Sequence, residues 1–230
     1  MATVRLFVSN SMRGVMEVLV PKFEASSGHE LAISYDPVKV MMERIRKGES
    51  ADVAILGGTA IEDLEKMGKI AAGSRRAVAS CGIGVAVGAR GPTLNIDTVD
   101  GFKRALLAAK SIAYTEQGAS GIYFSKLIED LGIAAQVKAK AVRQPGGLIG
   151  ELVAAGKAEM AVQQIPELMA VPGIRFVGPF PKETQLITRS SAGIFADARE
   201  PAAARAFLDF LLAPDSMRVL KAKGHEPAKP

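Results

Sequence analysis

The sequence TVRLFVSNSMRGVMEVLVPKFEASSG, residues 3–28, joins a strand, a polar turn and a helix in one continuous stretch. Thr3 to Val8 is β-branched and apolar, as expected of a buried strand. Ser9-Asn10-Ser11 follows, with residue types that favour helix N-caps. The next apolar residues recur at helical spacing and predict one buried helix face that ends near Gly28: Met12, Met16, Leu19 and Phe23.

The same alternation continues beyond this stretch. A strand predicted at 31–35 precedes a helix at 38–46, and a strand at 52–56 leads through Gly57-Gly58-Thr59 into another helix. Strands that alternate with helices favour a parallel sheet with helices on both faces. Ligands of such sheets bind beyond the carboxyl ends of the strands.

A second set of alternating elements follows. Residues 82–88 (GIGVAVG) are glycine-rich, but they continue as a strand and open no helix, so they predict a buried strand and no dinucleotide loop. The expected elements after them are a helix at 98–109, strands at 111–115, 137–142 and 159–164, helices after 121 and at 146–155, and extended segments at 175–177 and 187–195. We expect the last helices, 202–212 and 215–222, to pack on the first lobe.

The predicted fold is therefore α/β, with two Rossmann-like lobes that have mainly parallel sheets and are joined by two crossing segments. Lobe 1 is expected to contain residues 1–84 plus 185–230, and lobe 2 residues 85–184. We expect hinge bending where the chain crosses, near Val85 and Ile187.

Composition excludes several classes of function. The 29 Lys and Arg against 24 Asp and Glu are scattered along the chain, which disfavours nucleic-acid binding. A single cysteine and two histidines supply neither a disulfide framework nor a metal site, and no motif calls for a cofactor. No apolar run approaches the ~20 residues of a membrane span. The compartment stays open: cytoplasmic if Met1 is native, or periplasmic if a leader was removed.

Three predicted loops share one design, in which a strand ends, small or hydroxylated residues follow, and a helix begins. Such a loop offers free backbone N–H groups and side-chain donors to an anion, although simple helix capping explains the same residues. The candidate ligand-binding residues in these loops are Ser9, Asn10, Ser11, Gly57, Gly58, Thr59, Gly118, Ala119, Ser120 and Gly121.

Two further candidates lie in the second lobe. Gln163 and Gln164 end an otherwise apolar strand, where an amide pair can face a ligand or hold a buried loop. Gly146 lies in a strand-to-helix turn that can present backbone N–H groups. Among the arginines, Arg13, Arg75 and Arg76 can pair with carboxylates, or remain solvated at the surface.

Catalytic motifs are absent from the sequence. Hydrolytic elbows, zinc-binding helices and a phosphate-loop lysine are all missing, and no third group is apparent that would orient either histidine. Acid–base chemistry by Glu167 or Tyr123 remains open. No catalytic residue is assigned.

Five segments carry a resemblance to a known family: VRLFVSNS at 4–11, GESADVAI at 48–55, ASGIY at 119–123, GKAEMAVQQ at 156–164 and FLDFL at 207–211. The chain resembles type II periplasmic solute-binding proteins, in the molybdate-binding-like branch. The resemblance implies a monomer that closes on a small anion, an oxyanion or an organic carboxylate, and delivers it to an ABC permease.

The resemblance also assigns positions. Ser11 matches the serine of the first loop, Ser120 lies at the helix start in the second lobe, and Gln164 stands where the family has a tyrosine. The serine expected after the third strand falls at Leu56 or Gly57, and Thr59 is the nearest hydroxyl. These departures count against molybdate itself and leave an organic anion, such as a di- or tricarboxylate, open as the ligand.

Two alternatives to a binding protein stay open. The branch is also similar to aconitate isomerase, which implies an isomerase of a small unsaturated carboxylate built on the same fold. An effector-sensing domain would need a partner chain that carries DNA-binding helices.

Overall fold

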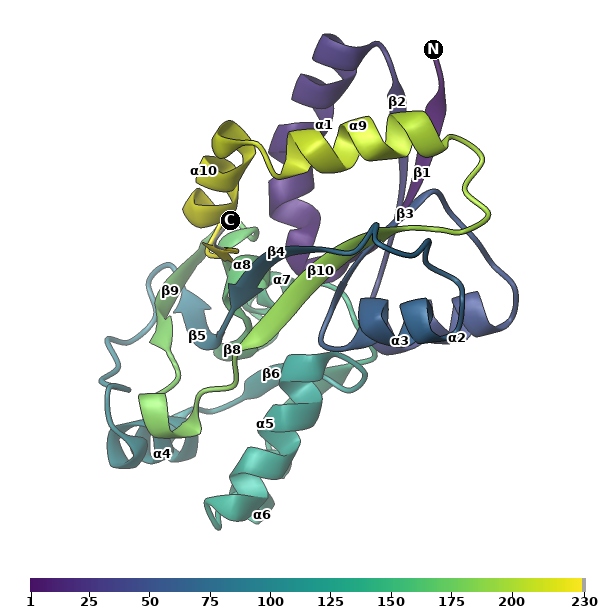
Figure 1. The fold of residues 1–230 in the computed structure, drawn as a ribbon. Helices are drawn as coiled ribbons and strands as arrows, with labels where there is room; N and C mark the ends of the chain where they lie inside the picture. Colours follow the sequence, from purple (N-terminus) through teal and green to yellow (C-terminus); the bar gives the residue numbers. More distant parts are fainter. Residues whose placement is uncertain (229–230) are drawn as a thin grey trace. The chain divides into compact units, whose positions relative to one another are not determined.

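The computed structural model describes residues 1–228 and forms two compact units (Figure 1). Unit 1 combines Met1–Cys81 with the chain from Thr188 onward, and unit 2 is Gly82–Ile187. The boundaries expected from the sequence, 84/85 and 184/185, each lie three residues from those of the units. Ile83 and Gly84 belong to unit 2 because they pair within its sheet.

Unit 1 has a six-stranded sheet in the order β11-β4-β10-β3-β1-β2. Its elements are β1 (Thr3–Ser9), the 3-10 helix η1 (Asn10–Met12), α1 (Arg13–Ser27), β2 (Glu30–Asp36), α2 (Val38–Arg46), β3 (Val53–Gly57), α3 (Ala60–Lys66), β4 (Arg76–Cys81), β10 (Thr188–Ile194), α9 (Pro201–Leu211), α10 (Pro214–Ala222) and β11 (Glu226–Pro227).

Unit 2 has a five-stranded sheet in the order β7-β6-β8-β5-β9. Its elements are β5 (Ile83–Gly88), α4 (Val99–Ala108), β6 (Ile112–Thr115), α5 (Ala119–Asp130), α6 (Ala134–Lys138), β7 (Ala141–Gln144), α7 (Gly150–Ala154), β8 (Met160–Gln164), α8 (Ile165–Met169), β9 (Ile174–Pro179) and the 3-10 helix η2 (Lys182–Thr184).

The α/β architecture is confirmed, but both sheets are mixed where mainly parallel sheets were expected. β1 is parallel to β2 and β3, and β6 is parallel to β7 and β8. β10 and β5 are antiparallel to both of their neighbours. These two strands bring the chain into a unit directly from the other one, whereas a parallel neighbour requires a crossover connection.

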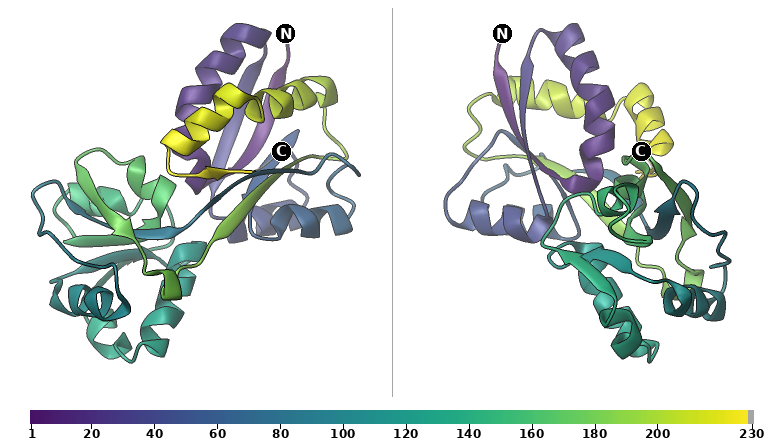
Figure 2. Two further views of the ribbon diagram at one scale, coloured as in Figure 1. Left: turned by 60° about the vertical axis from the view of Figure 1, so that its left-hand side comes forward. Right: turned by 180° about the vertical axis from the view of Figure 1, so that it is seen from behind.

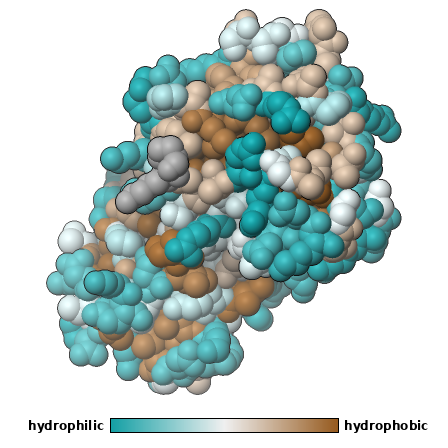
Figure 3. Space-filling model, in the orientation of Figure 1, coloured by the Kyte–Doolittle hydropathy of each residue, from teal (hydrophilic) through white to brown (hydrophobic). Residues whose placement is uncertain are grey.

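Each sheet buries an apolar cluster on both faces. In unit 1 one face packs against α1, α9 and α10, as the sequence predicted for the last helices, and the other packs against α2 and α3 (Figure 2). In unit 2 the two clusters involve α4 to α6 and α7 to α8. Figure 3 shows hydrophobic residues along α9 with hydrophilic residues around them. Within the described residues, no helix has both the length and the apolar character needed to cross a bilayer.

Some predicted elements differ from the structure. The strand expected at 137–142 is wrong at its start, because Ala134–Lys138 forms α6 and the chain pairs with β6 only from Ala141. The helix expected at 146–155 is limited to Gly150–Ala154, since Gly147 has a positive φ of 90°. The sequence analysis missed β4 and α8.

A buried carboxylate joins three elements of unit 1. Asp52 is fully buried just before β3 and accepts hydrogen bonds from the Arg5 backbone N–H at 2.8 Å and from the Arg5 guanidinium at 3.2 Å. The N–H groups of Arg199 and Glu200, next to the start of α9, also donate to it. Burial raises the pKa of Asp52, but these hydrogen bonds outweigh that effect and lower it below the usual value.

Asp52→Ala leaves these donors without their acceptor. We expect the free energy of unfolding to fall by roughly 3–5 kcal/mol, measured by urea denaturation at neutral pH. Asp36→Ala is the matched control, because Asp36 is partly exposed in its ion pair with Arg44 and should cost about 1 kcal/mol or less. Equal losses in the two variants would contradict this assignment.

Candidate functional site

In both units the candidate loops follow parallel strands and lie at the carboxyl end of each sheet. In unit 1 these loops follow β1 and β3, and in unit 2 they follow β6, β7 and β8. Because parallel strands end at the same edge, each unit gathers its candidates on one side of its sheet.

The first loop of unit 1 buries its polar residues. Ser9, Asn10 and Ser11 are all buried, and the hydroxyl oxygens of Ser9 and Ser11 lie 3.2 Å apart. No side chain caps η1 or α1. The expected N-cap serines therefore leave the N–H groups of this turn uncapped, and their hydroxyls pair with each other.

In the second loop of unit 1, more of the polar groups are already hydrogen-bonded within the protein. Gly58 has a positive φ of 69° and donates its N–H to the Arg189 carbonyl at 2.8 Å. A side chain at Gly57 would meet the Thr188 methyl at 3.0 Å. The Thr59 hydroxyl is exposed and donates to the Asp63 carboxylate at 2.8 Å, so its proton is already engaged within α3.

In unit 2 the start of α5 lies unusually close to the end of β6. A Cβ atom on Gly121 would lie 1.7 Å from the Thr115 carbonyl oxygen, and one on Gly118 would lie 2.4 Å from the Thr115 hydroxyl. Only glycine allows this approach. No side chain caps α5, and the N–H groups in the first turn of this helix have no partner inside it. Ser120, in that first turn, is 2% exposed.

Backbone bonds fix the loops after β6 and β7 together. The N–H groups of Glu116 and Gln117 donate to the carbonyls of Gln144 and Pro145 at 2.7 and 3.1 Å. The adjacent Gly146 is therefore held beside the loop that leads into α5.

Gln163 and Gln164 have different surroundings. Gln163 accepts from the Ile149 N–H at 2.9 Å and donates to the Gly147 carbonyl at 2.7 Å, so its amide holds the loop after β7. Gln164 is also buried, but its amide makes no hydrogen bond to another described residue. Of the pair, Gln164 is the one that remains available to a ligand.

Among the described residues, four buried polar residues besides Thr115 have side chains that make no internal hydrogen bond: Asn10, Ser120, Gln164 and Ser190. The sequence analysis missed Ser190, because it lies within β10, far along the chain from Gly57, with which it pairs in the sheet. Thr115 was also missed; it is 3% exposed, and its hydroxyl has no partner among the described residues. The Thr115 hydroxyl is fully enclosed without a partner among the described residues, whereas the polar atoms of the other four reach the surface, where water or a ligand can meet them.

The candidate arginines and Tyr123 already contact other groups within their own unit. The Arg13 guanidinium lies over the Tyr35 ring at 4.3 Å, and Arg75 pairs with Glu65. Arg76 donates to two nearby carbonyls. The Tyr123 hydroxyl donates to the Thr184 carbonyl at 2.9 Å, which gives this side chain a structural contact within unit 2.

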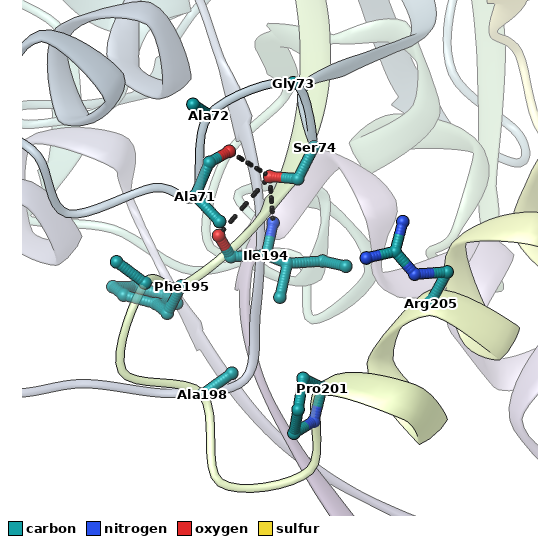
Figure 4. Close-up of a pocket in the computed structure, with 10 residues that line it drawn as sticks. Ala71, Ala72, Gly73, Ser74, Ile194, Phe195, Ala198, Pro201 and Arg205 are labelled. Carbon is teal, nitrogen blue, oxygen red and sulfur yellow. Dashed lines mark hydrogen bonds between the residues drawn. The ribbon is translucent and has the colours of Figure 1, made fainter.

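A pocket of about 210 Å³ in unit 1 lies away from these loops, at the opposite end of β10 (Figure 4). Small and apolar residues form most of its lining, and Arg205 extends toward it from α9. The Ser74 hydroxyl in its wall donates to the Ala71 carbonyl at 2.7 Å. None of the candidate ligand-binding residues lines this pocket.

Glu167 is the most strongly shifted acid of unit 2. It is buried in the first turn of α8, and this burial raises its pKa to about 8 against the opposing effects of the Gln164 backbone and the Gln163 side chain. Its ordinary value is 4.5, so between these two values the folded protein holds a proton that the unfolded chain releases.

The free energy of unfolding should therefore decrease as pH rises from about 5 toward 8, by at most about 1.4 kcal/mol per pH unit for this one group. Glu167→Gln removes the titration and should flatten that decrease. Urea unfolding at several pH values measures it, with the exposed Glu183→Gln as control. An unchanged slope in Glu167→Gln would show that Glu167 ionises normally.

Comparison with known proteins shows which family the chain belongs to. The family model for bacterial extracellular solute-binding proteins matches residues 4–226. An aconitate isomerase from Pseudomonas sp is 32% identical, with 98% of this chain and 88% of the relative aligned. The molybdate-binding protein of Azotobacter vinelandii is 25% identical over 97% of this chain and 90% of its own.

A solved structure agrees in fold. The periplasmic molybdate-binding protein of Azotobacter vinelandii superimposes with a TM-score of 0.81 at 18% identity, covering 99% of both chains. The resemblance inferred from the sequence, to type II solute-binding proteins of the molybdate-binding-like branch, is confirmed. The chain belongs to the family of bacterial extracellular solute-binding proteins.

Proposed function

We propose that this protein binds a small anion, preferably an organic carboxylate, through neutral donors at the carboxyl ends of its parallel strands, for delivery to an ABC permease. The observation that carries the proposal is that four buried polar residues, Asn10, Ser120, Gln164 and Ser190, have side chains that make no hydrogen bond to another described residue. Each is adjacent to a loop of the candidate set, and together they supply hydroxyl and amide donors.

Backbone donors add to these side chains. The uncapped first turn of α5 supplies N–H groups with the positive end of the helix dipole, which favours a negative group. The tight approach of Gly121 to Thr115 holds this turn in place. Since the candidate set contains no charged side chain, binding would depend on oriented dipoles.

Three observations favour a carboxylate over a tetrahedral oxyanion. Gln164 replaces the hydroxyl that the resemblance places at this position, and Thr59, the nearest hydroxyl after β3, is engaged with Asp63. The relative with the higher identity is the one named for an aconitate. Hinge bending near Val85 and Ile187 stays a prediction.

A thermal-shift panel of molybdate, tungstate, sulfate, phosphate and small di- and tricarboxylates tests the proposal, because a ligand that binds only the folded state raises the melting temperature. We expect a carboxylate to give the largest rise. Ser120→Ala should weaken its binding by roughly tenfold to a hundredfold, as for a lost hydrogen bond to a charged group.

Ser125→Ala, in the same helix but away from its first turn, is the matched control and should bind like the wild type. No stabilisation by any anion of the panel would contradict the proposed function. Equal effects of the two serine substitutions would argue against the α5 turn as the anion-binding element.

Isomerisation of a small unsaturated carboxylate is the second candidate function, favoured by 32% identity to an aconitate isomerase over nearly the whole chain. Glu167 offers a buried acid whose raised pKa suits proton transfer near neutral pH. An isomerase needs such a group to move a proton across the allylic system, whereas a carrier protein needs none.

Incubation with cis- or trans-aconitate separates the two functions, with the vinyl proton followed by NMR. Interconversion above a protein-free control would establish the isomerase and contradict a pure carrier. Aconitate that raises the melting temperature without interconverting would establish the carrier. Glu167→Gln should abolish any interconversion if this carboxyl transfers the proton.

A further inference from the structure

His225 makes a buried contact with the first candidate loop across almost the whole length of the chain. It is 1% exposed, and its Nε2 lies 3.0 Å from the Ser11 carbonyl oxygen. The sequence analysis found no group to orient this histidine, and that expectation is wrong. The Ser11 carbonyl does so from 214 positions away.

The chemistry of this contact fixes the tautomer of the ring. A carbonyl oxygen can only accept a hydrogen bond, so Nε2 must carry the proton. In the neutral ring Nδ1 is then an acceptor, and it is buried without a partner among the described residues. Burial lowers the pKa of His225, and the hydrogen bond to the Ser11 carbonyl opposes this effect only in part. The lowered pKa favours the neutral ring.

The backbone around His225 is held on both sides. Its own N–H donates to the Leu220 carbonyl at the end of α10, at 3.1 Å. The following residues form β11, which pairs with β4, and Ala228 donates to the Val78 carbonyl at 2.9 Å. The ring is therefore a fixed donor beside the turn that contains Ser11.

We infer that His225 is a positioning residue of the proposed anion site, which holds the Ser11 carbonyl and so sets the direction of the Ser9 and Ser11 hydroxyls. The inference rests on the proposed function, because it gives this contact a role in binding. Ser11 lies in η1, which no side chain caps; within the described residues its turn is held by the Arg13 N–H on the Asn10 carbonyl and by the pairing of the two serine hydroxyls. His225 adds a contact from near the other end of the sequence.

An amide pair tests the role of Nε2. In His225→Gln the side-chain amide nitrogen can occupy the place of Nε2 and donate to Ser11, whereas in His225→Asn it reaches only the place of Nδ1. We expect His225→Gln to bind trans-aconitate or molybdate within about threefold of the wild type and His225→Asn to bind at least tenfold more weakly, by calorimetric titration. Asparagine also fills less space than glutamine, so the two variants are compared at equal melting temperature, and a difference in affinity then reports the contact of Nε2 and not a loss of packing.

Nitrogen-15 NMR of the free protein gives a second readout, because it reports which ring nitrogen of His225 carries the proton. The protein has only two histidines, so the spectrum is simple to assign. His29→Gln assigns the two rings. We expect the His225 ring to show the neutral Nε2–H tautomer at neutral pH, and its signals to shift when trans-aconitate or molybdate is added.

The outcomes separate the inference from the proposed function. Equal affinity of the Asn and Gln variants, or an Nδ1–H tautomer at His225, would overturn the inference while anion binding by the wild type stands. Should His225→Asn fail to fold, a tenfold loss in a folded His225→Gln would overturn it equally. Failure of the wild type to bind either anion would overturn the proposed function, and the inference with it.

Discussion

The parallel pairing of one central strand with two neighbours is the constraint on which each unit depends. β1 lies between β2 and β3, and β6 lies between β7 and β8. Parallel pairing forces every connection to return through a helix, so loops with free N–H groups collect at one edge. Beyond these parallel strands, β10 and β5 are antiparallel to both of their neighbours. The candidate residues owe their common location to this pairing and not to any motif.

Local patterns revealed most of the fold and part of the site. The strand at 3–8 and the helix after it were predictable because apolar spacing and burial agree there. Residues 137 and 138, the end of α6, were misassigned to a strand because the apolar period of so short a segment does not separate a helical turn from a strand. The serine and glycine loops were found because helix starts require those residue types. Their hydrogen bonds were not predictable: Thr59 turns to Asp63 within its own helix.

Long-range partners were beyond the reach of the sequence. Asp52 receives N–H groups from residues 199 and 200, and His225 reaches Ser11. Neither contact leaves a periodic signal, because each depends on where the chain returns after unit 2 is complete. The same is true of Ser190, which becomes a neighbour of Gly57 only when β10 pairs with β3. Buried polar groups without local partners are the residues for which structure adds most to sequence.

The position of β10 between β3 and β4 also determines the order in which the chain can assemble during synthesis. Residues 1–81 lack the middle strand of their own sheet until residues 188–194 have left the ribosome, whereas unit 2 is continuous in sequence. Unit 2 can therefore fold first, while the earlier-made strands wait as an incomplete sheet with exposed edges. Such a nascent chain is exposed to aggregation and to proteases until its last segment arrives.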